Sequence, residues 1–155
     1  MSLKHIDGDL IKMAQNGDFD VIIHGCNCYA IMGGGIAAQV AQNFPPAALA
    51  DRQYNRAPEM RLGSFSYGLV GQDNNTDLMV INAYTQLRPG PDFRLISLAS
   101  ALKNITGSLR LQGKRIGMPK IGAGIGGGNW TYIEPVIELL MKDLDVTIVS
   151  YQPQT

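Results

Sequence analysis

Two glycine-rich segments hold the residue types best suited to chemistry. The first, residues 32–37, reads Met-Gly-Gly-Gly-Ile-Ala, and the second, residues 119–130, reads Pro-Lys-Ile-Gly-Ala-Gly-Ile-Gly-Gly-Gly-Asn-Trp. Glycine leaves backbone N–H groups uncovered, so a glycine run ahead of a helix can form an electropositive cradle for phosphate. Two such cradles in one chain predict that a diphosphate is held from both sides. The alternative is that both loops only make tight turns.

A polar segment, His24-Gly25-Cys26-Asn27-Cys28, lies between the apolar residues 21–23 and the first glycine run. We expect a buried strand at 20–23, with the polar residues beyond its carboxyl end, where open α/β sheets bind ligands. Histidine suits acid–base chemistry near neutral pH, which makes His24 a candidate catalyst. A buried core histidine is the alternative. Strand alternation would also place His24, Cys26 and Cys28 on one side, as a zinc site requires, but no fourth ligand is evident.

Other familiar catalytic patterns are missing from the sequence. Neither glycine run continues into the Lys-Ser/Thr of a P-loop, and 122–127 fits the dinucleotide fingerprint only formally, because no βαβ unit follows it. The glycine segments also lack the interleaved cations and aromatics of a surface for single-stranded nucleic acid.

Charge and composition limit the classes of protein. The chain has 13 Lys plus Arg and 13 Asp plus Glu, so affinity for phosphate must come from local amide groups and not from a global field. Its 155 residues fit one domain with a substantial core. The two cysteines form no disulfide framework, no apolar run reaches the ~18 residues of a membrane span, and the N-terminus has no signal-peptide core. We therefore expect a cytoplasmic protein without membrane contact.

Strand-like and helix-like segments alternate along the chain. Strands are expected at 3–6, 20–23, 63–70, 78–84, 115–118 and 146–151, and loops at 72–77 and 85–91. Helices are expected at 10–14, 34–44, 47–54, 95–109 and 131–144, the last with a capping box of Thr131 and Glu134. This alternation predicts an α/β fold with a largely parallel sheet and helices on both faces.

The order and spacing of these motifs resemble the macro domain family over nearly the whole chain. The residues that carry the resemblance are Gly8-Asp9-Leu10, 24–28 with 32–37, and 118–130. The resemblance implies a single domain, 1–155, built as a three-layer α/β/α sandwich with a mixed, mostly parallel sheet of about six strands. The His-x-Cys-Asn-Cys segment before Gly-Gly-Gly-Ile-Ala looks most like the ADP-ribose 1''-phosphate phosphatases, in the branch that also holds the terminal ADP-ribose hydrolases.

By position, the resemblance also implies roles for individual residues. Asp9, beside Leu10, would accept a hydrogen bond from the adenine amino group, and Tyr151 would stack on adenine. Asn27 would orient the distal ribose and His24 would act as acid or base, while Asp92 has only its loop position in its favour. The first loop, at the distal ribose and its phosphate, would use Gly33, Gly34, Gly35 and Ile36; the second, around the diphosphate, would use Gly122, Ala123, Gly124, Ile125, Gly126 and Gly127.

Two departures separate this sequence from the branch that removes ADP-ribose from glutamate. That branch uses a lysine in the loop matching 85–91 and an aspartate at the position of Gly126, and this sequence has neither. The resemblance therefore implies a monomeric hydrolase, without metal or cofactor, that binds ADP-ribose and cleaves ADP-ribose 1''-phosphate. A hydrolase that removes ADP-ribose from modified macromolecules and a non-catalytic ADP-ribose reader are the alternatives.

Overall fold

The computed structural model describes residues 3–71 and 77–151. The strands are β1 (Lys4–Gly8), β2 (Val21–Asn27), β3 (Phe65–Gly71), β4 (Asp77–Gln86), β5 (Arg115–Met118) and β6 (Asp145–Tyr151). The helices are α1 (Leu10–Gln15), α2 (Gly35–Asn43), α3 (Pro45–Gln53), α4 (Pro58–Arg61), α5 (Leu95–Ser108) and α6 (Trp130–Leu140).

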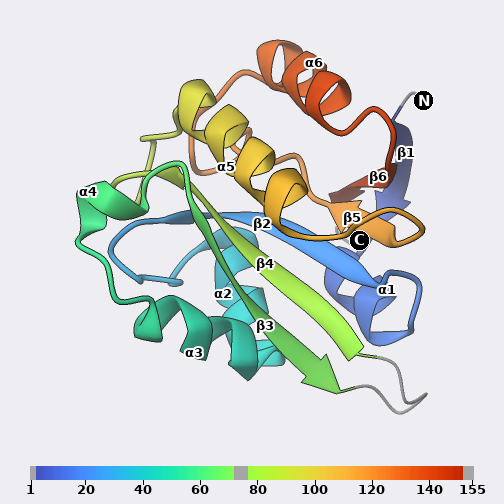
Figure 1. Ribbon diagram of the computed structural model, residues 1–155, viewed down its shortest axis with the longest axis horizontal. Helices are drawn as coiled ribbons and strands as arrows, with labels where there is room; N and C mark the ends of the chain where they lie inside the picture. Colours follow the sequence, from blue (N-terminus) through green and yellow to red (C-terminus); the bar gives the residue numbers. More distant parts are fainter. Residues whose placement is uncertain (1–2, 72–76, 152–155) are drawn as a thin grey trace.

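Among these residues, six strands form one sheet in the order β1-β6-β5-β2-β4-β3. Neighbouring strands pair in parallel except β3, which pairs antiparallel with β4 at one edge. Figure 1 shows α5 and α6 on one face of the sheet and α1, α2 and α3 on the other. The predicted three-layer α/β/α sandwich with a mixed, mostly parallel sheet is confirmed.

Each face of the sheet has its own apolar core. Ile23 of β2 packs with α5 residues such as Leu98 on one face, and its neighbour Ile22 packs with Val40 of α2 on the other. Successive strand residues point to opposite faces, so a strand covered on both sides must be apolar throughout. None of the helices in the described part of the chain is long and apolar enough to cross a membrane.

Strand β2 is longer than predicted, and this changes the position of the polar segment. It continues to Asn27, so His24 pairs with Asn82 of β4 in the ladder, and Cys26 pairs with Tyr84. Polar residues continue the strand here because β4 offers them polar neighbours. The prediction that His24 lies beyond the end of the strand is wrong.

Several helix boundaries also differ from the prediction. Phe44 is both the C-cap residue of α2 and the N-cap residue of α3. Helix α3 begins at Pro45, because the fixed φ of proline suits the first helical turn. Helix α6 begins one residue early, because the Asn129 side chain accepts a hydrogen bond from the Thr131 N–H. The predicted capping box is wrong, and Glu134 instead contacts His5 at 2.9 Å. Helix α4 has no counterpart in the prediction, and most of the predicted turn at 72–77 lies outside the described residues.

Candidate ligand-binding site

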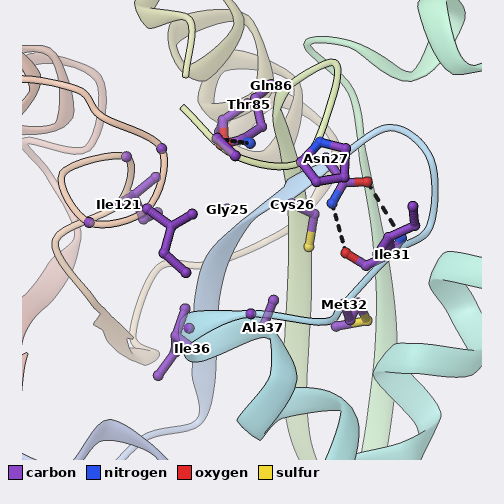
Figure 2. A pocket seen from close by; sticks show the side chains of 18 of the residues that line it. Gly25, Cys26, Asn27, Ile31, Met32, Ile36, Ala37, Thr85, Gln86 and Ile121 are labelled. Carbon is purple, nitrogen blue, oxygen red and sulfur yellow. Dashed lines mark hydrogen bonds between the residues drawn. The ribbon is translucent and has the colours of Figure 1, made fainter. Parts of the chain in front are cut away.

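A cavity of about 600 Å³ lies at the carboxyl ends of β2, β4 and β5. Its lining comes from the end of β2 and the loop to α2, the end of β4, the loop after β5, and Asp51 of α3. Figure 2 shows Ile121 on one side, Ile31 and Met32 on the other, and Ile36 and Ala37 at the start of α2. This is the edge of an α/β sheet where ligands are expected.

The two glycine loops meet across this cavity. Gly33 to Ile36 line it from the first loop, and Gly122, Gly124, Ile125 and Gly126 line it from the second. The Ile125 side chain lies against the first loop: a Cβ added at Gly34 would be 3.1 Å from Ile125 Cδ1. The prediction brought both loops to one site, although Ala123 and Gly127 are not part of the lining.

Helix α2 directs its N-terminus at the cavity. Gly34 is the N-cap residue and provides no side-chain hydrogen bond, so no side chain caps the first amide groups of the helix. Uncapped amides and the helix dipole favour an anion at this position. Lys120 also lines the cavity, with its Nζ 5.8 Å from the centroid of the Trp130 ring. The site is therefore suited to phosphate despite the zero net charge of the chain.

The second loop is held in place by its own backbone and by Phe93. The Gly128 N–H donates to the Gly122 carbonyl at 2.6 Å, and the Phe93 N–H donates to the Gly126 carbonyl at 3.1 Å. Gly122 has a φ of +80°, and a Cβ there would overlap the Phe93 ring. Glycine is thus required at position 122 by both conformation and space.

Asn27 lines the cavity, but its amide group is also engaged within its own loop. Asn27 Oδ1 accepts from the Tyr29 N–H at 2.9 Å. Figure 2 shows its two bonds to Ile31: Nδ2 donates to the Ile31 carbonyl at 2.7 Å, and Oδ1 accepts from the Ile31 N–H at 3.4 Å. These bonds close the turn in which Ala30 has a φ of +58°. Asn27 therefore sets the approach of the chain to the first glycine loop.

His24 is fully buried and does not line the cavity. Its Nε2 lies 2.7 Å from Asn82 Oδ1, while Asn82 Nδ2 donates to the Ala47 carbonyl and to Ser66 Oγ. This pattern assigns the ring proton to Nε2. Cys26, which does line the cavity, places its Sγ 3.6 Å from the same nitrogen.

Burial lowers the pKa of His24 to about 4, although the hydrogen bond that His24 donates to Asn82 acts to raise it, so the ring is neutral at pH 7. The described residues enclose His24 completely, so a ligand in the cavity would not contact it directly. The geometry therefore fits the alternative of a core histidine, and a part in catalysis stays a prediction without support from it.

The residues assigned to adenine lie at the same edge of the sheet but outside this cavity. Asp9 caps α1, with Oδ1 accepting from the Lys12 N–H at 3.1 Å, and Leu10 is buried in the core. Tyr151 is exposed and pairs with Gly8 in the ladder between β1 and β6. Asp9 and Tyr151 therefore lie at the carboxyl ends of β1 and β6. Strand β6 is the neighbour of β5, and the cavity begins at the end of β5. Their implied roles stay predictions.

Two carboxylates require a separate account. Asp92 Oδ2 accepts from the Leu87 and Arg88 N–H groups, so Asp92 closes the loop after β4 and does not line the cavity. Asp51 does line it and is missed by the sequence analysis. One signal could have found it: Asp51 falls at helical spacing from the buried residues Ala47 and Ala48, on the apolar side of α3.

The arrangement of the polar segment does not support the zinc alternative. Cys28 Sγ donates to the Gln86 carbonyl at 3.3 Å. Within residues 3–71 and 77–151, no group of three or more His, Cys, Asp or Glu side chains is arranged to hold a metal ion.

Fold and cavity together define an α/β protein with a cleft between two glycine loops that is suited to an anion. Residues 23–137 match the Macro domain family, and the chain belongs to that family.

Comparison with known proteins gives relatives over the whole length. The chain is 36% identical over 157 residues to an uncharacterized 17.5 kDa protein of Enterobacteria phage T4, with 99% of each covered. It is 29% identical over 160 residues to the ADP-ribose 1''-phosphate phosphatase of Lodderomyces elongisporus, with 97% of this chain and 100% of the relative covered. It is 26% identical to the DNA ADP-ribosyl glycohydrolase of Mycobacterium tuberculosis, covering 94% of this chain and 41% of the relative.

Solved structures give the same fold. A protein from Bacteroides thetaiotaomicron aligns with a TM-score of 0.80 at 24% identity, covering 97% of this chain and 98% of the other. The macrodomain of Mycobacterium tuberculosis DarG aligns with a TM-score of 0.73 at 22% identity, covering 98% of each chain.

Proposed function

We propose that the protein binds ADP-ribose in this cavity and hydrolyses ADP-ribose 1''-phosphate to ADP-ribose and phosphate. The observation that carries the proposal is the pair of glycine loops facing each other across one cavity. A pair of phosphate groups fits a site that offers amide groups from two sides. The full-length similarity to a protein named as an ADP-ribose 1''-phosphate phosphatase supports the choice of substrate.

The sheet order supports one direction for the ligand. The adenine would lie toward Asp9 and Tyr151, at the ends of β1 and β6. The diphosphate would lie between the two loops, and the distal ribose toward Asn27, at the end of β2. This order follows the strands β1, β6, β5 and β2, which are neighbours in the sheet.

The proposed reaction depends mainly on placement and on charge stabilisation. Water attacks phosphorus, the bond from phosphorus to the 1'' oxygen breaks, and the proton lost by water is taken up by the products. A phosphoryl group in transfer carries charge on its oxygens, which oriented backbone amides stabilise without reorganisation. Asn27 would act by holding the first loop. His24 would act only as a positioning residue, through Cys26, which it contacts in the wall of the cavity.

A second candidate, removal of ADP-ribose from modified macromolecules, is favoured by the similarity to a protein named as a DNA ADP-ribosyl glycohydrolase. The site argues against the variant that uses a lysine and an aspartate. Residues 85–91 contain no lysine, and a Cβ on Gly126 would lie 3.0 Å from Gln86 Oε1 and 3.1 Å from the Gly122 carbonyl. An aspartate at position 126 would require these neighbours to shift by a few tenths of an ångström.

A panel of substrates separates these functions. Purified protein is incubated with ADP-ribose 1''-phosphate, with ADP-ribosylated DNA and with ADP-ribosylated protein, and the release of phosphate or ADP-ribose is measured. We expect release of phosphate from the first substrate. Release of ADP-ribose from a macromolecule would favour the second candidate, and tight binding of ADP-ribose without turnover of any substrate would identify a reader. Absence of ADP-ribose binding would refute the proposal altogether.

A further inference from the structure

Asp51 is a buried carboxylate that lines the cavity and has no part in the function proposed so far. It belongs to α3, and 1% of the residue is exposed. A carboxylate is rarely buried to this degree unless its oxygens have partners.

One carboxylate oxygen of Asp51 has partners in the protein. Oδ1 accepts a hydrogen bond from the Tyr84 hydroxyl at 2.8 Å and lies 3.6 Å from Arg61 Nη1. Arg61 is held by other groups as well, because it donates to the backbone carbonyls of Asp51, Tyr54 and Arg56. The guanidinium also lies over the rings of Tyr54 and Tyr84. The Asp51 carboxylate is therefore fixed in direction.

The second oxygen, Oδ2, is not engaged in this way. The hydrogen bonds and ion pair of the Asp51 carboxylate within the described chain all involve Oδ1. Every fully buried side-chain nitrogen and oxygen of the described residues has a hydrogen-bond partner, so Oδ2 is not sealed inside the protein. Asp51 is one of the residues that line the cavity, and we take the cavity as the space that Oδ2 faces.

The place of Asp51 in the fold determines which part of a ligand it meets. Helix α3 packs on β3 and β4, at one edge of the sheet, whereas Asp9 and Tyr151 lie at β1 and β6, at the opposite edge. Of the described residues that line the cavity, Asp51 and Lys120 carry charge. Lys120 follows β5, near the second glycine loop, whereas Asp51 comes from α3 and is bonded to Tyr84 of β4.

From this geometry we infer that Asp51 belongs to the ligand site and that its Oδ2 accepts a hydrogen bond from a hydroxyl group of the distal ribose. This inference rests on the proposed function. An ionised carboxylate only accepts hydrogen bonds, so a ribose hydroxyl group suits it as a donor. Burial raises the pKa of Asp51, which indicates that the carboxylate lacks solvation that a hydroxyl donor would supply.

The test compares two ligands that differ in the distal ribose. Binding of ADP-ribose and of ADP is measured by calorimetry at pH 7.5 for the wild type, for Asp51→Asn and for Asp20→Asn. The Asp20→Asn control makes the same change in another arginine-paired carboxylate, where Asp20 Oδ1 lies 3.0 Å from Arg115 Nη2, before the start of β2 and far from the cavity. We expect Asp51→Asn to weaken ADP-ribose about 10- to 100-fold and ADP less than about 3-fold. Asp20→Asn should change neither.

Two outcomes would overturn the inference: Asp51→Asn binds both ligands as the wild type does, or it weakens both by the same factor. Because Asp51→Asn leaves the Arg61 charge without its carboxylate, thermal unfolding is measured alongside. If that variant does not fold, crystals of the wild type with ADP-ribose decide. Oδ2 within about 3.2 Å of a ribose hydroxyl oxygen supports the inference, and a separation beyond about 4 Å refutes it.

These results also separate the inference from the proposed function. If the wild type binds ADP-ribose and releases phosphate from ADP-ribose 1''-phosphate while Asp51→Asn behaves identically, the inference fails and the proposed function stands. If the wild type does not bind ADP-ribose, the proposed function fails and the inference fails with it.

Discussion

Lowering the pH from 7 to 4 should destabilise the fold through His24. Histidine has a pKa near 6.5 in an unfolded chain, and burial lowers the pKa of His24 to about 4 in the folded protein. Between these values the unfolded chain binds a proton that the folded chain does not. Stability therefore falls as the pH drops through this window, and the His24 contribution becomes constant below about pH 4. The difference in pKa corresponds to about 3 kcal/mol in the free energy of unfolding.

Urea denaturation at a series of pH values between 7 and 4 measures this effect. The test variant is His24→Gln, because a glutamine side chain can still donate an N–H to Asn82 Oδ1 but does not titrate. The control is His5→Gln, which removes the second histidine of the chain, a partly exposed residue paired with Glu134. We expect the wild type and His5→Gln to lose about 3 kcal/mol more than His24→Gln between pH 7 and pH 4.

Identical pH dependence in the wild type and His24→Gln would refute the reasoning. It would mean that His24 is protonated in the folded protein, as a histidine open to the cavity would be. The same reasoning predicts that any pH profile of phosphate release has no step near pH 6.5 caused by His24, because the neutral ring titrates only near pH 4.

Three further changes test other parts of the site. Gly122→Ala should cost about 2 kcal/mol in thermal unfolding and abolish measurable ADP-ribose binding by calorimetry, because φ is +80° and the added Cβ meets Phe93. The control, Gly107→Ala in α5, has open space around it and should do neither. Equal behaviour of the two variants would contradict this prediction. Asn27→Ala should reduce the free energy of unfolding in urea by about 1 kcal/mol and weaken ADP-ribose binding about tenfold, because the turn before the first loop loses its side-chain hydrogen bonds. Unchanged affinity would show that these hydrogen bonds are not needed to position the first loop. Asp20→Asn should cost at most about 1 kcal/mol at pH 7, because its ion pair with Arg115 is partly exposed. Arg115 lowers the pKa of Asp20, so this contribution should disappear as the pH falls through that lowered value in urea titrations, and a loss near neutral pH would contradict the assignment.

Much of the fold could be predicted because local pattern and tertiary environment agree. The apolar spacing of α5, from Leu95 to Ile105, predicts its buried face, and the glycine loops mark the carboxyl ends of β2 and β5. Such loops need glycine for local reasons, as Gly122 shows with its positive φ and its contact with Phe93. Local requirements of this kind are visible in a sequence without any alignment.

The position of His24 could not be predicted, because it depends on a residue that is distant in the sequence. A polar residue after an apolar run usually ends a strand, but Asn82 of β4 satisfies His24 inside the sheet. Asn82 is in turn held by the Ala47 carbonyl of α3 and by Ser66 of β3. Only the assembled sheet shows that three elements supply this environment.

Asp51 was missed for a related reason. A charged residue in a helix is normally exposed, and the spacing of Asp51 from Ala47 and Ala48 does not by itself outweigh that expectation. Its burial depends on Arg61 and Tyr84, which come from α4 and β4. Helix α4 was itself not predicted, so the partner of the carboxylate could not be recognised.

The most direct test of the account is a crystal structure of the protein with ADP-ribose bound. The account predicts that the two phosphate groups lie between the first loop, residues 33–36, and the second loop, residues 122–126, with their oxygens within about 3.2 Å of backbone nitrogens from both. A ligand bound elsewhere, or phosphates that contact neither loop, would contradict it.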